Sequence, residues 1–342
     1  MVHELSAYQN DVQGLDVAIL TMIEGGAVEA PIQVYEGKMR SGFDIHPGRL
    51  RNIYRVLKQY DILHWHGFSP QIAVCSLLAG RPIVHTEHGT FKRANQRQSW
   101  TDFVKKRLLG VPFLRRFPAQ VVFVSDWLRQ EVGLETDRGI VVHNGTAMNG
   151  RVKRASVRDQ DTFQVLFAGR LAPVKRVDRL ISAFASLEKS EGVHLHIVGD
   201  GPSRTSLEEQ AREMLQPGRY TFHGYCTDVD PFYEAADLVV LPTRGESFGL
   251  VAIEAMRWGV PILCCPDGGG VVEVLEGVHD KLVVDDLARA IMFWRGHPEE
   301  QVRVGQQLQE RALSYFTVER MAEDYKQVYE HVLNGQDEAA RL

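Results

Sequence analysis

Short apolar runs alternate with amphipathic stretches along most of the chain. A short run rich in Val and Ile, bounded by polar residues, predicts a buried strand. In the first half such runs lie at residues 17–20, 32–35, 62–65, 83–85, 121–124 and 140–142. The last run leads into Asn144-Gly145, a strong turn signal. A polar stretch without periodicity follows at 147–162, and we interpret residues 151–162 as a linker between two domains.

The second half restarts the same pattern. Its predicted strands lie at residues 163–167, 194–198, 220–222, 238–241 and 262–265. A helix after Gly169 carries one apolar face, formed by Val177, Leu180, Ile181, Phe184 and Leu187. Near the end of the chain, a second helical repeat consists of Met321, Tyr325, Val328 and Val332.

Alternation of strands and helices predicts parallel sheets, and two such blocks predict an α/β protein with two doubly wound, Rossmann-like domains facing each other across a cleft. We expect an N-terminal domain at 1–150 and a C-terminal domain at 163–315. The helix and tail at 316–342 are expected to pack back on the N-terminal domain. The length of 342 residues agrees with two domains.

Composition narrows the functional classes. With 44% hydrophobic and 24% charged residues, the chain is typical of a globular protein, and a net charge of −5 gives no overall attraction to nucleic acid. The four cysteines lack a CxxC spacing and predict small core residues in a reducing compartment. The sequence contains no apolar stretch of about 18 residues and no signal-peptide pattern at its start, so we expect a cytoplasmic protein.

Two glutamates eight positions apart are the most informative feature of the chain. Glu246 follows the predicted strand 238–241, and Glu254 is expected about two turns into a helix that begins near Phe248. Both therefore lie at the carboxyl end of the sheet, where open α/β sheets bind ligands. The backbone amides of Phe248, Gly249 and Leu250 are expected to point into the same space. This arrangement suits a polar ligand with several hydroxyl groups.

Several motifs in order along the chain carry a family resemblance. Residues 169–178 (GRLAPVKRVD), 198–202 (VGDGP) and 222–225 (FHGY) precede the two-glutamate motif, and 64–67 (HWHG), 85–89 (HTEHG) and 143–145 (HNG) lie in the first half. Together they resemble the GT-B glycosyltransferases of family 4, also called glycosyltransferase group 1. The resemblance covers nearly the whole chain, with the donor-binding domain in the second half.

The resemblance implies roles for individual residues on the donor side. Arg170 and Lys175 are similar to the cations that stabilise the departing diphosphate of a nucleotide sugar. Glu254 is implied to bind the two ribose hydroxyls, and Glu246 to contact the donor sugar. Gly199 and Tyr225 are expected to line the nucleotide cleft. The alternative from the residues alone is that Arg170 and Lys175 are solvated surface cations, that Glu246 is a capping residue, and that Glu254 is an exposed helix residue.

On the acceptor side, the resemblance places His88 over the donor sugar, and His66 and His85 are rivals at neighbouring strand ends. A histidine there can exchange a proton with the acceptor or donate a hydrogen bond. The family retains the anomeric configuration of the donor.

Other polar and glycine-rich positions admit plainer interpretations. Asp200 is interpreted as structural, capping the following helix. The glycines at 268–270 are equally consistent with a close backbone approach to the ligand and with a flexible loop. The DxD string at Asp228-Val229-Asp230 is typical of metal-dependent sugar transferases, but it opens a short helix, as Asp285-Asp286 also does. We therefore expect no metal and no cofactor other than the nucleotide-sugar substrate.

The segment 92–116 combines eight basic residues with a single acidic one and with interleaved apolar residues. Such a segment indicates either peripheral contact with the anionic inner face of a membrane or a solvated helical face over the core. Relatives begin with a strand and a glycine-rich loop before the helix that residues 2–8 resemble, so about 10–15 residues of strand and loop are absent before Met1. We expect that the start is misplaced, and the alternative is that the protein lacks part of its site. Ala147 stands where the family often has an aspartate.

The sequence therefore predicts an enzyme that transfers a sugar from a nucleotide-sugar donor to a glycan or lipid-linked acceptor in cell-envelope polysaccharide or lipopolysaccharide synthesis. Two alternatives are a sugar-nucleotide epimerase on the same scaffold and a truncated, non-catalytic paralogue that binds a nucleotide or a partner. A dinucleotide dehydrogenase is disfavoured because neither half has a strand followed by GxGxxG.

Overall fold

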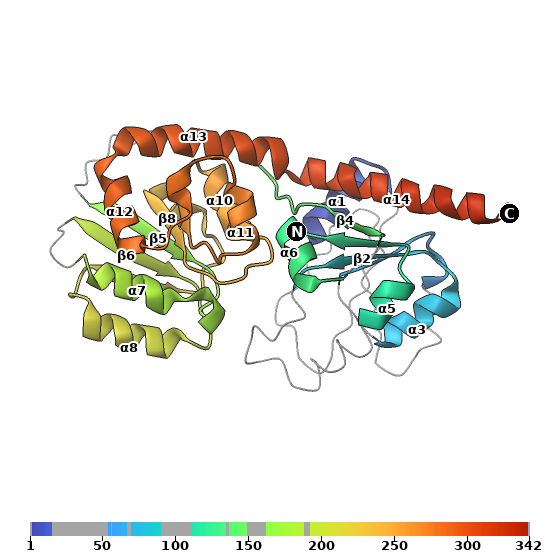
Figure 1. Ribbon diagram of the computed structural model, residues 1–342, viewed down its shortest axis with the longest axis horizontal. Coiled ribbons are helices and arrows are strands. Elements are labelled where there is room, and N and C mark those ends of the chain that lie inside the picture. Colours follow the sequence, from blue (N-terminus) through green and yellow to red (C-terminus); the bar gives the residue numbers. More distant parts are fainter. Residues whose placement is uncertain are drawn as a thin grey trace.

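The computed structural model contains two α/β domains, and the last two helices of the chain run along them in turn, first along the C-terminal domain and then along the N-terminal one (Figure 1). It describes residues 2–15, 54, 55, 57–66, 70–89, 111–134, 137–148, 162–187 and 192–340. The predicted strands at 17–20 and 32–35 lie outside the described residues, as do the linker at 151–161 and most of the basic segment 92–116. The parallel strands in both domains confirm the predicted Rossmann-like fold class.

The N-terminal sheet has four parallel strands in the order β1-β2-β3-β4. They are β1 (Leu63–Trp65), β2 (Ile83–Glu87), β3 (Gln120–Phe123) and β4 (Gly139–Val141). The helices of this half are α1 (Val2–Asp11), α3 (Pro70–Ala79), α5 (Val111–Arg116) and α6 (Asp126–Val132). Because successive strand residues point to opposite faces, β2 and β3 contribute to two separate hydrophobic clusters, one on each face of the sheet.

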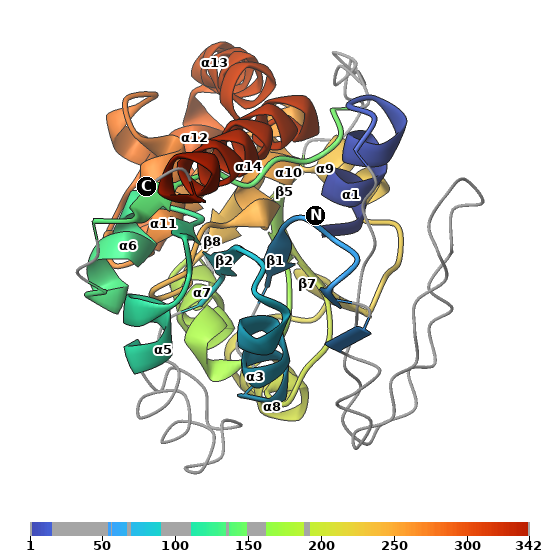
Figure 2. The same ribbon diagram turned by 90° about the vertical axis from the view of Figure 1, so that its right-hand side faces the viewer.

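Helix α14 (Val318–Ala340) covers one face of the N-terminal sheet, although it follows the C-terminal domain in the chain. Figure 2 shows α1 and α14 on the side of the sheet opposite α3 and α5. The predicted apolar repeat of α14 is buried there against Val84 and Val122. Polar contacts add to this packing: the Thr86 hydroxyl lies 3.0 Å from the Tyr325 hydroxyl, and His64 Nδ1 lies 2.7 Å from the Tyr329 hydroxyl.

The C-terminal sheet has five parallel strands in the order β7-β6-β5-β8-β9. They are β5 (Phe163–Ala168), β6 (Val193–Val198), β7 (Tyr220–Gly224), β8 (Leu238–Leu241) and β9 (Ile262–Cys264). The helices are α7 (Val177–Ala185), α8 (Arg204–Met214), α9 (Asp230–Ala235), α10 (Leu250–Arg257), α11 (Gly270–Leu275), α12 (Leu287–Gly296) and α13 (Pro298–Tyr315), with short 3₁₀ helices η2 (Pro173–Lys175) and η3 (Asp280–Leu282). The strand order reverses beside β5, which places a crevice at the carboxyl ends of β5 and β8.

Two helix predictions can be compared with the structure in detail. The apolar face of α7 is buried as expected, with Leu180, Ile181 and Phe184 fully inaccessible. Helix α10 begins at Leu250 and not near Phe248, because Gly249 has a left-handed φ of 101° and occupies the N-cap. Glu254 therefore lies little more than one turn into the helix, whereas the sequence predicts about two turns.

Two predictions from composition concern the burial of the cysteines and membrane-spanning helices. Cys75, Cys264 and Cys265 are buried free thiols, as predicted, whereas Cys226 is half-buried. Among the described helices, none combines the length and the apolar character that crossing a membrane requires.

A row of histidines crosses one face of the C-terminal sheet. His196 Nδ1 lies 2.9 Å from His223 Nε2, and His196 Nε2 lies 2.7 Å from Gln164 Oε1. Burial lowers the pKa of His196 to about 4, and the neighbouring His194 and His223 lower it further. The native state therefore holds this ring neutral at pH values where the unfolded chain would protonate it.

From this pKa we predict that stability falls on acidification. Since the folded pKa lies below the unfolded value, the unfolded state binds more protons, and the stabilisation present above pH ~6.5 is lost as the pH falls towards 4. Partial solvent exposure reduces the effect to about 1–2 kcal/mol. Calorimetric unfolding at pH 7 and pH 5 should show a smaller pH dependence for His196→Gln than for the wild type and for the exposed control His331→Gln. The same pH dependence in all three proteins would exclude His196 as its source.

Candidate functional site in the cleft between the domains

The two domains are joined at a crossing of two chain segments. Thr146 pairs with Thr317 as an isolated β-bridge, with Thr146 N donating to Phe316 O (3.0 Å) and Val318 N donating to Thr146 O (3.2 Å). A Cβ on Gly145 would lie 2.0 Å from Thr317 O, so only glycine allows the segments to approach this closely. The crossing fixes the end of the N-terminal domain against the start of α14.

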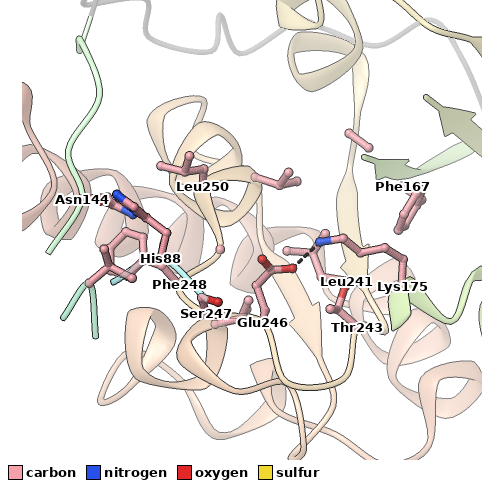
Figure 3. Close-up of a pocket in the computed structure, with 15 residues that line it drawn as sticks. His88, Asn144, Phe167, Lys175, Leu241, Thr243, Glu246, Ser247, Phe248 and Leu250 are labelled. Carbon is pink, nitrogen blue, oxygen red and sulfur yellow. Dashed lines mark hydrogen bonds and ion pairs between the residues drawn. The ribbon is translucent and has the colours of Figure 1, made fainter. Parts of the chain in front are cut away.

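A cavity of about 270 Å³ lies between the domains at this crossing. Figure 3 shows His88 and Asn144 of the N-terminal domain on one side of it and Lys175 on the opposite side, with Glu246 between them. Further lining residues come from the loop after β8 and the start of α10, namely Thr243, Ser247, Phe248, Gly249 and Leu250. The cavity therefore brings together six of the residues predicted from sequence: His88, Lys175, Glu246, Phe248, Gly249 and Leu250.

Lys175 and Glu246 form an ion pair in this cavity. Lys175 lies in η2, after β5, and its Nζ donates to Glu246 Oε2 in the loop after β8 (Figure 3). Both side chains are about three quarters buried, at 23% and 26% exposed. The neighbouring cation Arg176 is occupied elsewhere, since its guanidinium pairs with Asp267. A cation and a carboxylate at adjoining strand ends can bind phosphate oxygens and sugar hydroxyls side by side.

Glycines in the loops after β8 and β9 allow these loops to pack closely beside the cavity. A Cβ on Gly249 would lie 2.5 Å from Val271 Cγ2, and its φ of 101° also favours glycine. At residues 268–270, added Cβ atoms would meet backbone atoms of Cys265, Glu246 and Ser247. The glycines at 269 and 270 thus allow the loop after β9 to pack against Glu246 and Ser247. This packing differs from both interpretations offered by the sequence, a close approach to the ligand and a flexible loop.

Glu254 contacts Tyr233 and does not line the cavity. The Tyr233 hydroxyl donates to Glu254 Oε2 at 2.7 Å. Burial raises the pKa of Tyr233 well above 10, and the charge of Glu254 raises it further, so the phenol remains a donor over the whole physiological range. One carboxylate oxygen of Glu254 is thereby held in place by a fully buried side chain.

Two histidines of the N-terminal domain, His66 and His88, form a pair beside the cavity. His88 Nε2 lies 2.9 Å from His66 Nδ1, and the two rings stack at 5.2 Å. Burial lowers the pKa of His88, against the opposing charge of Glu87, and burial lowers the pKa of His66 to about 3. Both rings are therefore neutral near pH 7. The other rival, His85, is fully buried, with Nε2 3.4 Å from Glu87 Oε2, and does not line the cavity.

Glu273, which the sequence did not single out, connects the two domains. Its carboxylate on α11 accepts hydrogen bonds from the backbone N–H groups of Asp126 (3.1 Å) and Trp127 (3.0 Å), at the N-terminus of α6, and lies 2.7 Å from His143 Nε2. Burial raises its pKa, but the bonds from His143, Trp127 and Asp126 outweigh burial and lower it overall. Helix α11 starts at the glycine loop, so this contact links the cavity wall to the N-terminal domain.

Ser125 makes a second connection. As the N-cap of α6, its hydroxyl oxygen accepts from Leu128 N (3.0 Å), and the same hydroxyl donates to Ser247 O of the cavity loop (2.6 Å). No local sequence signal identifies either connection, because each joins residues more than 120 positions apart.

Besides Glu254, three further predicted donor residues lie outside the lining of the cavity. Arg170 is exposed and forms no ion pair with residues that the structure describes. Tyr225 is 76% exposed beyond the end of β7. Gly199 lies against Gly169, since an added Cβ would be 1.9 Å from Gly169 O. Glycine at position 199 therefore allows the loops after β5 and β6 to approach each other closely.

The remaining acidic candidates have structural contacts. Asp200 accepts from Gly201 N (2.6 Å) and Arg204 (3.1 Å), but the N-cap of α8 is Ser203, so the predicted capping role is wrong in detail. Asp230 opens α9, as predicted for the DxD string, and its carboxylate pairs with Arg257. Asp286 caps α12 by accepting from Arg289 N.

Two family models match adjoining parts of the chain. Residues 1–148 match the model described as Glycosyltransferase Family 4, and residues 149–311 match Glycosyl transferases group 1. The junction of the two models falls close to the crossing at Thr146.

A curated relative is the D-inositol 3-phosphate glycosyltransferase of Streptomyces coelicolor. It is 29% identical over 301 residues, which cover 75% of this chain and 66% of the relative. In two further relatives the match spans 60% and 48% of their length. The chain thus spans about half to two thirds of the length of these relatives.

Solved structures share the fold. The crystal structure of Anabaena Alr3699/HepE in complex with UDP and glucose has a TM-score of 0.71 at 22% identity, covering 82% of this chain and 80% of that one. Sucrose-phosphate synthase from Thermosynechococcus elongatus has a TM-score of 0.74 at 21% identity, covering 98% and 93%. These similarities establish the two-domain architecture of the chain.

Proposed function

Because the chain belongs to the group 1, family 4 glycosyltransferases, we propose that it transfers a hexose from a nucleoside-diphosphate sugar to an acceptor hydroxyl. The observation that carries this proposal is the interdomain cavity, where the Lys175–Glu246 pair faces His88 across a space of about 270 Å³. UDP is the first nucleotide to test, because the Anabaena protein with the same fold was crystallised in complex with UDP and glucose.

In the proposed reaction, the bond between the anomeric carbon and the donor phosphate oxygen breaks, and the nucleoside diphosphate leaves with the electron pair. The acceptor oxygen bonds to the anomeric carbon and loses its proton, so the products are a glycoside, a nucleoside diphosphate and a proton. Lys175, with Arg170 from the same loop, would stabilise the charge that develops on the diphosphate. Glu246 would hold sugar hydroxyls, and Glu254 the ribose. This chemistry needs no metal in our proposal.

We further propose retention of the anomeric configuration, with acceptor attack from the face that the leaving group occupied. His88 is neutral near pH 7 and lines the same cavity, so it can donate a hydrogen bond to the sugar or accept the acceptor proton. Anomeric analysis of the first product by NMR tests this part of the proposal, and an inverted product would refute it.

The acceptor is proposed to be a glycan or a lipid-linked molecule of the cell envelope, reached by peripheral contact with an anionic membrane. Supporting this, Val74, Leu77 and Leu78 on α3 are exposed, and so are Arg115, Arg116 and Phe117 at the end of α5. Figures 1 and 2 show α3 and α5 at the same end of the N-terminal domain. Phe113 and Leu114 of α5, in contrast, are buried in the core. Binding to anionic but not neutral vesicles would support membrane contact.

Lys175→Ala tests the proposed transfer directly. Loss of a charge-assisted contact to the diphosphate should cost about 1.5–3 kcal/mol, or about 10- to 150-fold in kcat/KM. The measurement is nucleoside diphosphate release from UDP-glucose in the presence of extracted envelope acceptor. Lys281→Ala, outside the cavity, is the matched control. Equal kcat/KM for Lys175→Ala and the wild type would remove Lys175 from the reaction.

Product analysis separates the two alternatives. An epimerase would convert the donor sugar in the absence of any acceptor, whereas a non-catalytic paralogue would bind the nucleotide without turnover. The proposed transferase forms a new glycoside only when an acceptor is added.

A further inference from the structure

Asn144 is a landmark of the sequence that the donor and acceptor roles above leave unused. It lies three residues after the end of β4, at the point where the chain enters the domain crossing. Its side chain is 5% exposed, and it lines the cavity beside His88, opposite Lys175 (Figure 3).

The backbone on both sides of Asn144 is fixed. His143 lies 2.7 Å from Glu273 and stacks on Phe248 with ring centroids 5.7 Å apart. Gly145 packs against Thr317 and donates its N–H to Met321 Sδ at 3.2 Å. Contacts with both domains therefore hold the backbone at Asn144 beside the cavity.

The side-chain oxygen of Asn144 lacks a hydrogen-bond partner. Oδ1 is buried, and no donor reaches it from the described part of the chain. A buried amide oxygen without a partner is costly, by an amount comparable to a lost hydrogen bond, and such groups in native proteins call for an explanation. A ligand group in the cavity would satisfy it.

The chemistry of the amide restricts that group. An amide presents an acceptor oxygen and a donor nitrogen close together, and their assignment can be exchanged by rotating the group. A hydroxyl can donate or accept, so it complements the amide in either orientation, whereas a phosphate oxygen can only accept. The position of Asn144 beside His88 and opposite Lys175 puts it on the sugar side of the cavity, away from the cation.

We propose that Asn144 hydrogen-bonds a hydroxyl of the donor's sugar ring and so contributes to sugar specificity; this inference rests on the proposed function. A site that hydrogen-bonds a hydroxyl discriminates strongly against sugars that lack it, because its own polar group is then left unpaired. Asn144 would therefore distinguish hexoses by the presence and the orientation of one hydroxyl.

The test compares Asn144→Ala with the wild type in calorimetric titrations without acceptor. The probes are UDP and UDP-glucose, and, in parallel, GDP and GDP-mannose. We expect the affinity for the nucleotide sugar to fall about 5- to 150-fold in the variant, while the affinity for the nucleoside diphosphate stays within about twofold. Asn334→Ala, at an exposed position of α14, is the control and should leave all four affinities unchanged.

Thermal unfolding gives a second measurement that separates binding from a structural role. Since Asn144 Oδ1 has no partner in the described structure, Asn144→Ala should melt at or above the wild-type temperature. An equal loss of nucleotide and nucleotide-sugar affinity together with a lower melting temperature would show a structural role and overturn the proposal. An unchanged nucleotide-sugar affinity would also overturn it. If the wild type binds none of the four probes, the proposed function fails, and this inference fails with it.

Deoxy analogues of UDP-glucose then identify the hydroxyl. The analogue that lacks the partner of Asn144 should bind the wild type and Asn144→Ala with equal affinity, because the two deletions remove the same interaction. Additive losses for every analogue would contradict a direct hydrogen bond.

Discussion

Replacing Glu273 by alanine is expected to lower the free energy of unfolding by about 3 kcal/mol. The substitution removes a charged acceptor from two backbone N–H groups at the start of α6 and from His143, and leaves these donors unpaired at the domain interface. Hydrogen bonds to charged groups contribute about 1.5–3 kcal/mol each, and contacts that share one partner are not additive. Differential scanning calorimetry measures this loss, with the exposed Glu276→Ala on the same segment as the matched control.

The Glu273→Ala substitution should also lower the catalytic efficiency of the enzyme. Glu273 joins α11, which starts at the glycine loop of the cavity, to α6 and His143. Without it the cavity walls from the two domains are less firmly held, and we expect a lower kcat/KM. The pKa of Glu273 is lowered in the folded state, so its contribution is present near neutral pH and is lost as the pH falls through the folded value. A Glu273→Ala protein with wild-type stability would show that the domains are held by other contacts.

Replacing Glu254 by alanine is expected to weaken nucleotide binding about 10- to 150-fold. This magnitude corresponds to about 1.5–3 kcal/mol for hydrogen bonds that a carboxylate makes to ribose hydroxyls. Tyr233 holds one carboxylate oxygen at 2.7 Å, which orients Glu254 before the nucleotide binds. Calorimetric titration with UDP and GDP measures the change, and the exposed Glu234→Ala on the neighbouring helix is the control.

Tyr233→Phe distinguishes the orienting role of Tyr233 from simple packing. The variant keeps the buried ring and removes only the donor to Glu254, so we expect a smaller loss, of about 2- to 10-fold in nucleotide affinity.

For Glu254→Ala, nucleotide affinity equal to that of the wild type would mean that the nucleoside does not bind at α10, and would contradict the role that the family resemblance implies.

The fold was predictable because each strand and helix carries its own local pattern. The buried runs at 83–85, 121–124 and 238–241 became β2, β3 and β8, and the repeat at Met321, Tyr325, Val328 and Val332 became the buried face of α14. The start of α10 was misplaced because the apolar pattern continues through Phe248. The left-handed Gly249 sets the helix start, and glycine is required there because an added Cβ would lie 2.5 Å from Val271 Cγ2.

The site was predictable only in part. Strand-end positions and motif resemblance placed Lys175, Glu246 and His88 at one cavity, but their pairing across 71 residues of sequence is a tertiary feature. Glu273 and Ser125 had no such signal, because a glutamate within a helix or a serine before one is typical of solvated faces and caps in any protein. The sequence showed Asn144 only as a turn residue and as part of the motif at 143–145, since its buried, unpaired oxygen follows from packing.

The most direct test of the central claim, that this cleft binds a nucleotide sugar, is the thermal stability of the wild type with UDP, GDP, ADP and dTDP. At 100 times its dissociation constant, a ligand adds about 2.7 kcal/mol, or several degrees for domains of this size. We predict a shift with one of the four nucleotides that is lost in Glu254→Ala. The absence of a shift with all four at millimolar concentration would contradict the claim.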